Sequence, residues 1–100
     1  MPFQVHIVPS ALDELRAIQV FFRRPIAAAI EQQLIHQPTV ETKHRKRLLN
    51  VEPSFEHEPP LWELRVGDFR VFYDADESSA SVLVRAIRQK PPPAATEQIL

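Results

Sequence analysis

The sequence predicts an α+β fold of order β-α-α-β-β-β, with two helices packed on one face of a mostly antiparallel four-stranded sheet. Apolar residues alternate in four short runs, and they recur at helical spacing in the two segments between the first and second runs. The single glycine, Gly67, lies with Asp68 between two alternating runs, which is typical of a two-residue β-hairpin turn. One hundred residues, 44% hydrophobic and 25% charged, suit one domain with a single core.

The first part of the chain is predicted to form one strand and two helices. The strand spans residues 3–8, where apolar residues alternate with polar ones. Ser10 is predicted to cap a helix that runs to about Phe22, because a serine oxygen can accept a bond from the free amides of the first turn. A second helix over 25–37 begins with proline, whose fixed φ suits a first turn. Three alanines at 27–29 predict close packing between the two helices.

Residues 61–74 are predicted to form the central hairpin, LWELRVGDFRVFYD. A turn at Gly67 places Arg65 opposite Arg70 on one face of the hairpin. The other face is apolar and pairs Val66 with Phe69, Leu64 with Val71 and Trp62 with Tyr73. Like charges that face each other across two strands destabilise a sheet. The two arginines are therefore predicted to bind something anionic on the face opposite the helices.

Two further segments complete the predicted domain. Residues 39–60 form a long polar connection, predicted to be mobile at its basic cluster, which consists of Lys43, Arg45, Lys46 and Arg47. Residues 81–89 form the last strand. The sequence thus predicts a single domain over 1–90 and a proline-rich, frayed tail over 91–100.

Composition excludes several classes of site and of protein. The chain has no cysteine, so disulfides and thiolate metal sites are excluded and a reducing compartment is predicted. It has no basic leader and no apolar run long enough to span a membrane, so we predict a cytoplasmic protein without a membrane partner. Its four histidines lack metal-ligand spacing, and neither a P-loop nor a dinucleotide motif is present. No metal and no cofactor is predicted.

Each candidate site has an ordinary structural alternative. The face that carries Arg65 and Arg70 could be a solvated face on which Glu63 pairs with either arginine. The basic cluster could be a solvated loop. Together they could instead form a groove for phosphate groups. His44, within the basic cluster, and His57 are the two histidines placed for acid–base chemistry.

The hairpin, the following VLVRAI segment and the ETKHRKRL segment at 41–48 resemble the RelE/ParE superfamily of type II toxin–antitoxin toxins. The resemblance covers roughly residues 3–90. It implies the fold predicted above and a cognate antitoxin that binds DNA and neutralises the toxin with an acidic, partly helical segment. RelE-like members of the superfamily cut mRNA on the ribosome, whereas ParE-like members poison DNA gyrase.

The resemblance also implies roles for particular residues. Arg65 and Arg70 match basic hairpin positions, and Lys90, or Arg88 if the strand is bulged, lies near a basic position at the end of the last strand. Glu63 stands where some active members carry a lysine. RNA phosphates would be held by residues of the basic cluster and of the last strand, namely Lys43, Arg45, Lys46, Arg47, Arg85 and Arg88.

The general base that such cleavage needs is missing from its expected place, because no tyrosine, histidine or arginine follows Lys90. His44 or Glu63 would then have to serve as the base. Three interpretations stay open at this point: a RelE-like mRNA endoribonuclease, a ParE-like toxin that is not a nuclease, and a degenerate module that only binds an antitoxin.

Overall fold

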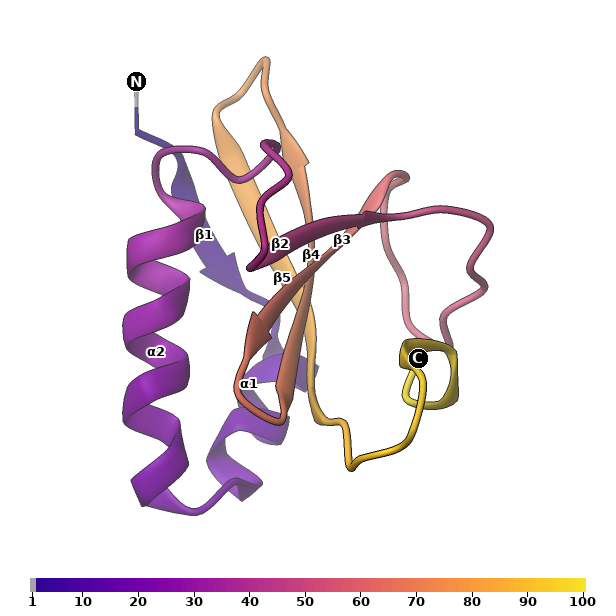
Figure 1. The fold of residues 1–100 in the computed structure, drawn as a ribbon. Helices are drawn as coiled ribbons and strands as arrows, with labels where there is room; N and C mark the ends of the chain where they lie inside the picture. The colour runs from indigo at the N-terminus through magenta and orange to yellow at the C-terminus, as the bar shows by residue number, and fades with distance from the viewer. Residues whose placement is uncertain (1) are drawn as a thin grey trace.

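The structure, a computed structural model, describes residues 2–100, so Met1 of the predicted domain lies outside the described residues. Two helices lie on one face of a five-stranded sheet of order β1-β5-β4-β3-β2 (Figure 1). The elements are β1 (Gln4–Ile7), α1 (Pro9–Ala17), α2 (Val20–Leu34), β2 (Arg45–Leu48), β3 (Leu61–Val66), β4 (Phe69–Asp76), β5 (Ser81–Gln89) and a 3-10 turn, η1 (Thr96–Gln98). Only β1 runs parallel to its neighbour, β5. The α+β class is confirmed, whereas the expectation of four strands was one too few.

The additional strand is β2, which contains most of the predicted basic loop. It pairs antiparallel with β3, with Arg45 opposite Leu64 and Leu48 opposite Leu61. Leu48 packs on the apolar cluster of the sheet face away from the helices, which fixes the register of the strand. β2 lies at the edge of the sheet, where charged residues discourage pairing with another chain. The basic cluster is therefore largely a strand and not the mobile loop that was expected.

The β3–β4 hairpin has the predicted register. Trp62 pairs with Tyr73, and Arg65 pairs with Arg70. Gly67 has a φ of 56°, a left-handed conformation that glycine adopts without the strain of a side chain. The apolar face of the hairpin is buried against the helices, as predicted, and the Trp62 and Tyr73 rings stack with centroids 6.3 Å apart.

The two helices differ from the prediction in their boundaries. α1 begins at Pro9 with Val8 as the N-cap, so Ser10 is not the cap. The chain becomes extended at Ile18, whose carbonyl accepts a 2.6 Å bond from Arg23 Nε, and α2 already begins at Val20. Pro25 thus lies inside α2 and not in its first turn.

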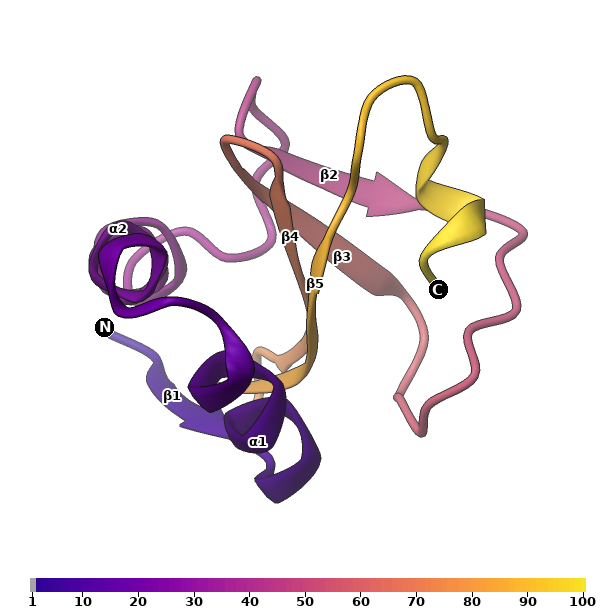
Figure 2. The same cartoon turned by 90° about the horizontal axis from the view of Figure 1, so that it is seen from below.

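Contrary to the prediction, the alanine segment of α2 does not mediate packing between the two helices. Ala27 and Ala28 are exposed, and the helix buries Ile26, Ile30 and Leu34 instead. Each helix packs mainly on the sheet, as Figure 2 shows. The sheet, and not a helical hairpin, therefore provides most of the core surface.

Apolar side chains cover both faces of the sheet. The larger cluster lies under the helices. A smaller cluster on the other face is formed by Leu61, Phe72 and Ala86. Residues 49–60 and the C-terminal segment lie beside that second face (Figure 2), and Ile99 and Leu100 pack on its cluster. The segment expected to be frayed thus has defined contacts with the sheet.

Candidate functional site

The candidate site is the sheet face away from the helices, called here the outer face, and its centre is an arginine pair with one carboxylate. Glu63 Oε2 lies 3.4 Å from Arg65 Nε, and Glu63 Oε1 lies 3.6 Å from Arg70 Nε. The Glu63 side chain is 1% exposed, whereas those of Arg70 and Arg65 are 12% and 44% exposed. The carboxylate offsets the repulsion between the arginines, so the ion pairs of the ordinary structural interpretation are present.

Glu63 has a third partner that the sequence did not indicate. The Thr96 hydroxyl, far along the chain, donates a 2.6 Å hydrogen bond to Glu63 Oε1. Both carboxylate oxygens are therefore engaged, one with Arg65 and one shared by Thr96 and Arg70. In this arrangement Glu63 accepts from protein donors, and its buried side chain is not placed to take a proton from a substrate.

Arg70 is fixed by the hairpin turn. Its Nη1 donates to the carbonyl oxygens of Gly67 and Phe69, at 2.8 and 2.9 Å. Its Nε is buried without a hydrogen-bond acceptor, because the nearest Glu63 oxygen is too distant for a good bond. Because this Nε is buried, an anion would contact the Arg70 guanidinium only through the 12% of the side chain that is exposed.

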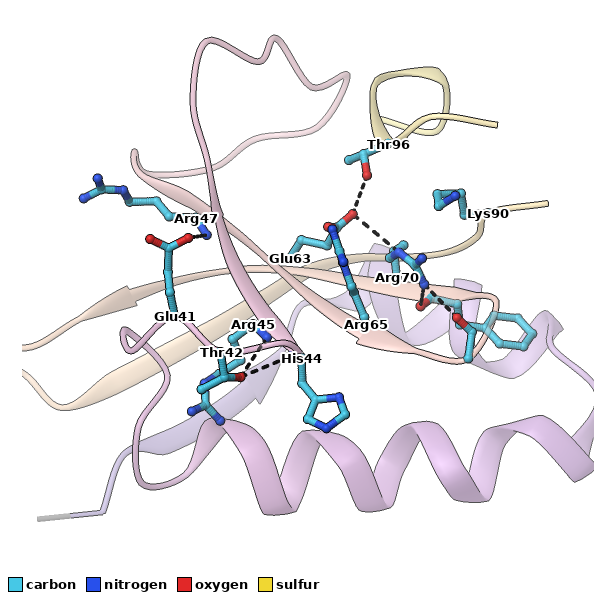
Figure 3. A network of polar contacts seen from close by, with 12 residues as sticks. Glu41, Thr42, His44, Arg45, Arg47, Glu63, Arg65, Arg70, Lys90 and Thr96 are labelled. Atoms are coloured by element: carbon cyan, nitrogen blue, oxygen red, sulfur yellow. Dashed lines mark hydrogen bonds and ion pairs between the residues drawn. The ribbon is translucent and has the colours of Figure 1, made fainter. Parts of the chain in front are cut away.

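Lys90 lies beside this pair, as Figure 3 shows. Its backbone N–H donates to the carbonyl of Asp68 at 2.6 Å, which ties the end of β5 to the hairpin turn. Its Nζ donates to the carbonyl of Ala94 at 2.7 Å. The structure therefore brings together Arg65, Arg70, Glu63 and Lys90 among the predicted site residues.

Arg85 and Arg88, which were predicted to bind phosphate, have internal partners instead. Arg85 Nε lies 2.7 Å from Asp74 Oδ2. Arg88 Nε lies 3.2 Å from Glu14 Oε2, and its guanidinium lies 5.2 Å from the centre of the Phe55 ring. Two paired, partly buried guanidinium groups hold the outer face together, so neither is free for RNA in this structure.

Arg45 is also a structural residue. It is 6% exposed, on the helix side of the sheet. Its Nε donates to the carbonyl of Val40 at 2.9 Å, and its Nη1 donates to the carbonyl and the side chain of Gln33 at 3.1 and 2.5 Å. These bonds tie the start of β2 to α2, so Arg45 is engaged inside the fold, and its contact with phosphate stays a prediction that this geometry does not support.

The other basic-cluster residues are exposed, but only one lies next to the arginine pair. Lys46 is opposite Glu63 across β2 and β3, whereas Arg47 is opposite Trp62 of the helix-side cluster and Lys43 precedes the strand. The His44 side chain is on the α2 side of β2 (Figure 3). His44 is therefore not positioned beside Arg65 and Arg70, and its expected role as a base has no support in this geometry.

Tyr73, the single tyrosine, is not a candidate base either. It is fully buried, and its hydroxyl donates to the carbonyl of Pro38 at 2.5 Å. Burial raises the pKa of Tyr73 well above its ordinary value, an effect that the nearby Arg45 charge only partly opposes. The Tyr73 side chain is therefore part of the hydrophobic core.

Two further features, a metal-binding cluster and a membrane-spanning helix, are absent from residues 2–100. This part of the chain has no group of three histidine, aspartate or glutamate side chains arranged to hold a metal ion. It also has no helix with the length and apolar character that a membrane span requires.

Comparison with solved structures identifies the architecture. The toxin–antitoxin complex RelBE2 from Mycobacterium tuberculosis contains a chain with a TM-score of 0.70 and 16% identity, over 90% of this chain and 100% of the other. The archaeal RelE–RelB complex from Pyrococcus horikoshii OT3 contains a chain with a TM-score of 0.70 and 17% identity, and the match covers 92% of this chain and 99% of the other. A free arginine-to-alanine double mutant of E. coli RelE has a TM-score of 0.62 and 19% identity, and the match covers 90% of this chain and 84% of the other. This chain has the RelE fold.

The comparisons establish the fold and not the chemistry, since all three identities are below 20%. No protein-family model matches the sequence, and no curated protein matches it significantly. Two of the three solved structures with the RelE fold are complexes of a toxin with its antitoxin. The resemblance noticed in the sequence is confirmed at this level.

Proposed function

We propose that this chain is the RelE-like toxin of a type II toxin–antitoxin pair and acts in the cytoplasm by cleaving ribosome-bound mRNA. The observation that carries the proposal is the grouping of Arg65, Arg70 and Lys90 on the outer face of a RelE fold. The side chains of Arg65 and Arg70 are 44% and 12% exposed. Such a group is suited to the phosphate of an RNA chain.

The chemistry of metal-independent RNA cleavage assigns these groups a definite task. A base removes the proton of the 2′-hydroxyl, the oxygen attacks phosphorus, and an acid protonates the leaving oxygen. Arg65 and Arg70 would stabilise the extra negative charge of the pentavalent intermediate, since guanidinium groups remain protonated. Lys43, Lys46 and Arg47 would contact backbone phosphates along β2 and its approach.

A second candidate function is favoured by the state of Glu63. Both of its oxygens have protein partners, His44 lies on the other side of β2, and Tyr73 is buried. Among the described residues, none of these three presents a free base next to the arginines. The second candidate is a toxin of this fold that is not a nuclease, or a module that only binds an antitoxin.

The partner in either case would be an antitoxin. We expect it to lay an acidic, partly helical segment across the outer face and β2, where it would neutralise Arg65, Arg70 and the exposed basic residues. Two structural neighbours are complexes with RelB, which supports such a partner. A segment that becomes ordered on binding should also raise the melting temperature of the toxin.

The proposal is tested by inducing the chain without any partner in a bacterial host while growth, protein synthesis and plasmid supercoiling are followed together. An early loss of protein synthesis with new mRNA ends is the expected result. Altered supercoiling with continued early translation would favour a gyrase-directed toxin. Normal growth with folded protein present would favour the antitoxin-binding module.

A further inference from the structure

The C-terminal segment 91–100, called here the strap, turns back across the outer face (Figures 1 and 2). Three polar contacts hold it. The Thr96 hydroxyl binds Glu63, the carbonyl of Ala94 accepts from Lys90 Nζ, and the carbonyl of Ile99 accepts from Arg88 Nη1 at 2.7 Å. Ile99 and Leu100 add apolar contact with the outer-face cluster.

Each polar contact of the strap involves a group at or next to the arginine pair. The Lys90 ammonium, which could contact a phosphate, is bound to a strap carbonyl. Thr96 holds the Glu63 oxygen that would otherwise be free to approach Arg70. The strap itself contains one acidic residue, Glu97, and no basic one. It therefore covers cationic groups without contributing any positive charge to the face.

We propose that the strap closes the outer face in the free protein, and that single-stranded RNA must displace it to reach Arg70 and Lys90. This inference rests on the proposed function, because it takes RNA as the ligand of the outer face. It adds that the toxin exists in a closed and an open form, and that binding strength depends on the fraction that is open.

The way the strap is attached permits it to leave without disturbing the sheet. The chain is fixed up to Lys90, whose backbone N–H binds the hairpin turn. Residues 91–93 are prolines, which have no N–H to donate to a neighbouring strand. Beyond them the only regular structure is the single turn η1. The strap thus has a fixed starting point at Lys90, three prolines that donate no backbone bond, and few contacts. An element with these features can open locally.

The groups under the strap also keep partners when it leaves. Arg88 retains Glu14 and the Phe55 ring, and Glu63 retains Arg65 and Arg70. Lys90 Nζ, in contrast, loses its hydrogen bond to the carbonyl of Ala94 and becomes available to a phosphate. Opening is therefore expected to change Lys90 the most.

The test compares four forms of the protein: the full chain, a chain that stops after Lys90, Thr96→Val and Glu97→Gln. Binding of a fluorescent single-stranded RNA oligonucleotide is measured by anisotropy at several salt concentrations. Thr96→Val removes the hydroxyl but keeps the shape of the side chain, so it loosens the strap without exposing the apolar cluster. Glu97→Gln removes the strap's acidic charge at an exposed position, and so controls for charge alone.

We expect the shortened chain to bind RNA more tightly than the full chain, by about tenfold if the strap is closed nine-tenths of the time. Thr96→Val should lie between the two, and Glu97→Gln should match the full chain. The emission of the buried Trp62 and the melting temperature verify that each form is folded.

If folded Thr96→Val and the shortened chain bind RNA no more tightly than the full chain, the strap does not close the outer face. The proposed function would remain intact. If no form binds RNA, both the closing role of the strap and the assignment of RNA to the outer face are wrong.

Discussion

Arginines of this chain illustrate how the same side chain serves opposite purposes on the two faces of one sheet. Arg45 is buried on the helix side and donates to three acceptors from Val40 and Gln33. Arg65 lies on the outer face, largely accessible and held by one carboxylate. The first stabilises the fold, whereas the second is available to a ligand.

Replacing Arg45 with methionine should lower the free energy of unfolding by roughly 1–3 kcal/mol, because its three partly buried hydrogen bonds to Val40 and Gln33 would be lost. Urea unfolding measures the change. Lys46→Met on the same strand is the matched control, and it should change stability by less than about 0.5 kcal/mol, since Lys46 is exposed. Similar small effects of both substitutions would contradict the structural role of Arg45.

Tyr73→Phe should remove the donor to the buried carbonyl of Pro38 and cost about 1 kcal/mol of stability. It should also change the response to alkali. The pKa of Tyr73 is raised in the folded state, so its contribution is complete below the unfolded value of about 10 and is lost as the pH rises above it.

Unfolding measured from pH 8 to pH 11 should therefore show a steeper alkaline loss of stability in the natural chain than in Tyr73→Phe. The comparison is clean because the chain has no other tyrosine. Parallel pH profiles for the two proteins would mean that Tyr73 titrates normally in the folded state.

At the scale of elements, the β3–β4 hairpin is the part that local sequence determines most completely. Alternation, a two-residue turn and one glycine specify its register, its buried face and the direction of its arginines. The sequence therefore predicted the arginine pair and the strands that present it.

Gly67→Ala should destabilise the protein by about 1–2 kcal/mol through backbone strain alone. The φ of 56° disfavours a side chain, although a Cβ at this position would meet no atom within 4 Å. Gly67→Asn should cost less, because asparagine tolerates this conformation. Thermal unfolding ranks the two variants, and an alanine variant as stable as the natural chain would show that the turn adapts freely.

β2 could not be predicted in the same way, because four successive residues dominated by charge resemble a solvated loop. Its pairing depends on Leu48 and on the internal bonds of Arg45, which are visible only when distant segments are brought together. The same applies to the strap, whose contact between Thr96 and Glu63 joins residues 33 positions apart. Long-range contacts of this kind carry no local sequence signal.

The exposed charges of β2 lead to a prediction about salt. Replacing Lys46 and Arg47 with glutamine should weaken RNA binding and reduce the slope of log affinity against log salt by about 1.4, at about 0.7 for each lost phosphate contact. Arg16→Gln with Arg24→Gln, two exposed charges on the helices, should leave the slope unchanged. Equal effects of the two pairs would mean that binding follows net charge and not the position of the charges on β2.

At the scale of the whole molecule, the sheet separates the larger apolar core from the face proposed to bind RNA. The larger apolar core and the buried Arg45 and Tyr73 lie on the helix side, whereas Arg65, Arg70 and Lys90 lie on the other. A net charge of −1 conceals this separation, because acidic residues elsewhere balance the basic ones. Substitutions on the outer face can therefore change binding while the core continues to support the RelE fold.

A reconstituted translation reaction with purified protein shows whether the outer face makes this chain a translation-inhibiting toxin. Product formation and the ends of the mRNA are measured for the natural chain, for Arg65→Glu with Arg70→Glu, and for Arg16→Glu with Arg24→Glu as a charge-matched control. We predict that the natural chain and the control stop translation and cut the mRNA, while the outer-face variant, still folded, does neither. A natural chain that leaves translation unaffected, or an outer-face variant as inhibitory as the natural chain, would contradict the account.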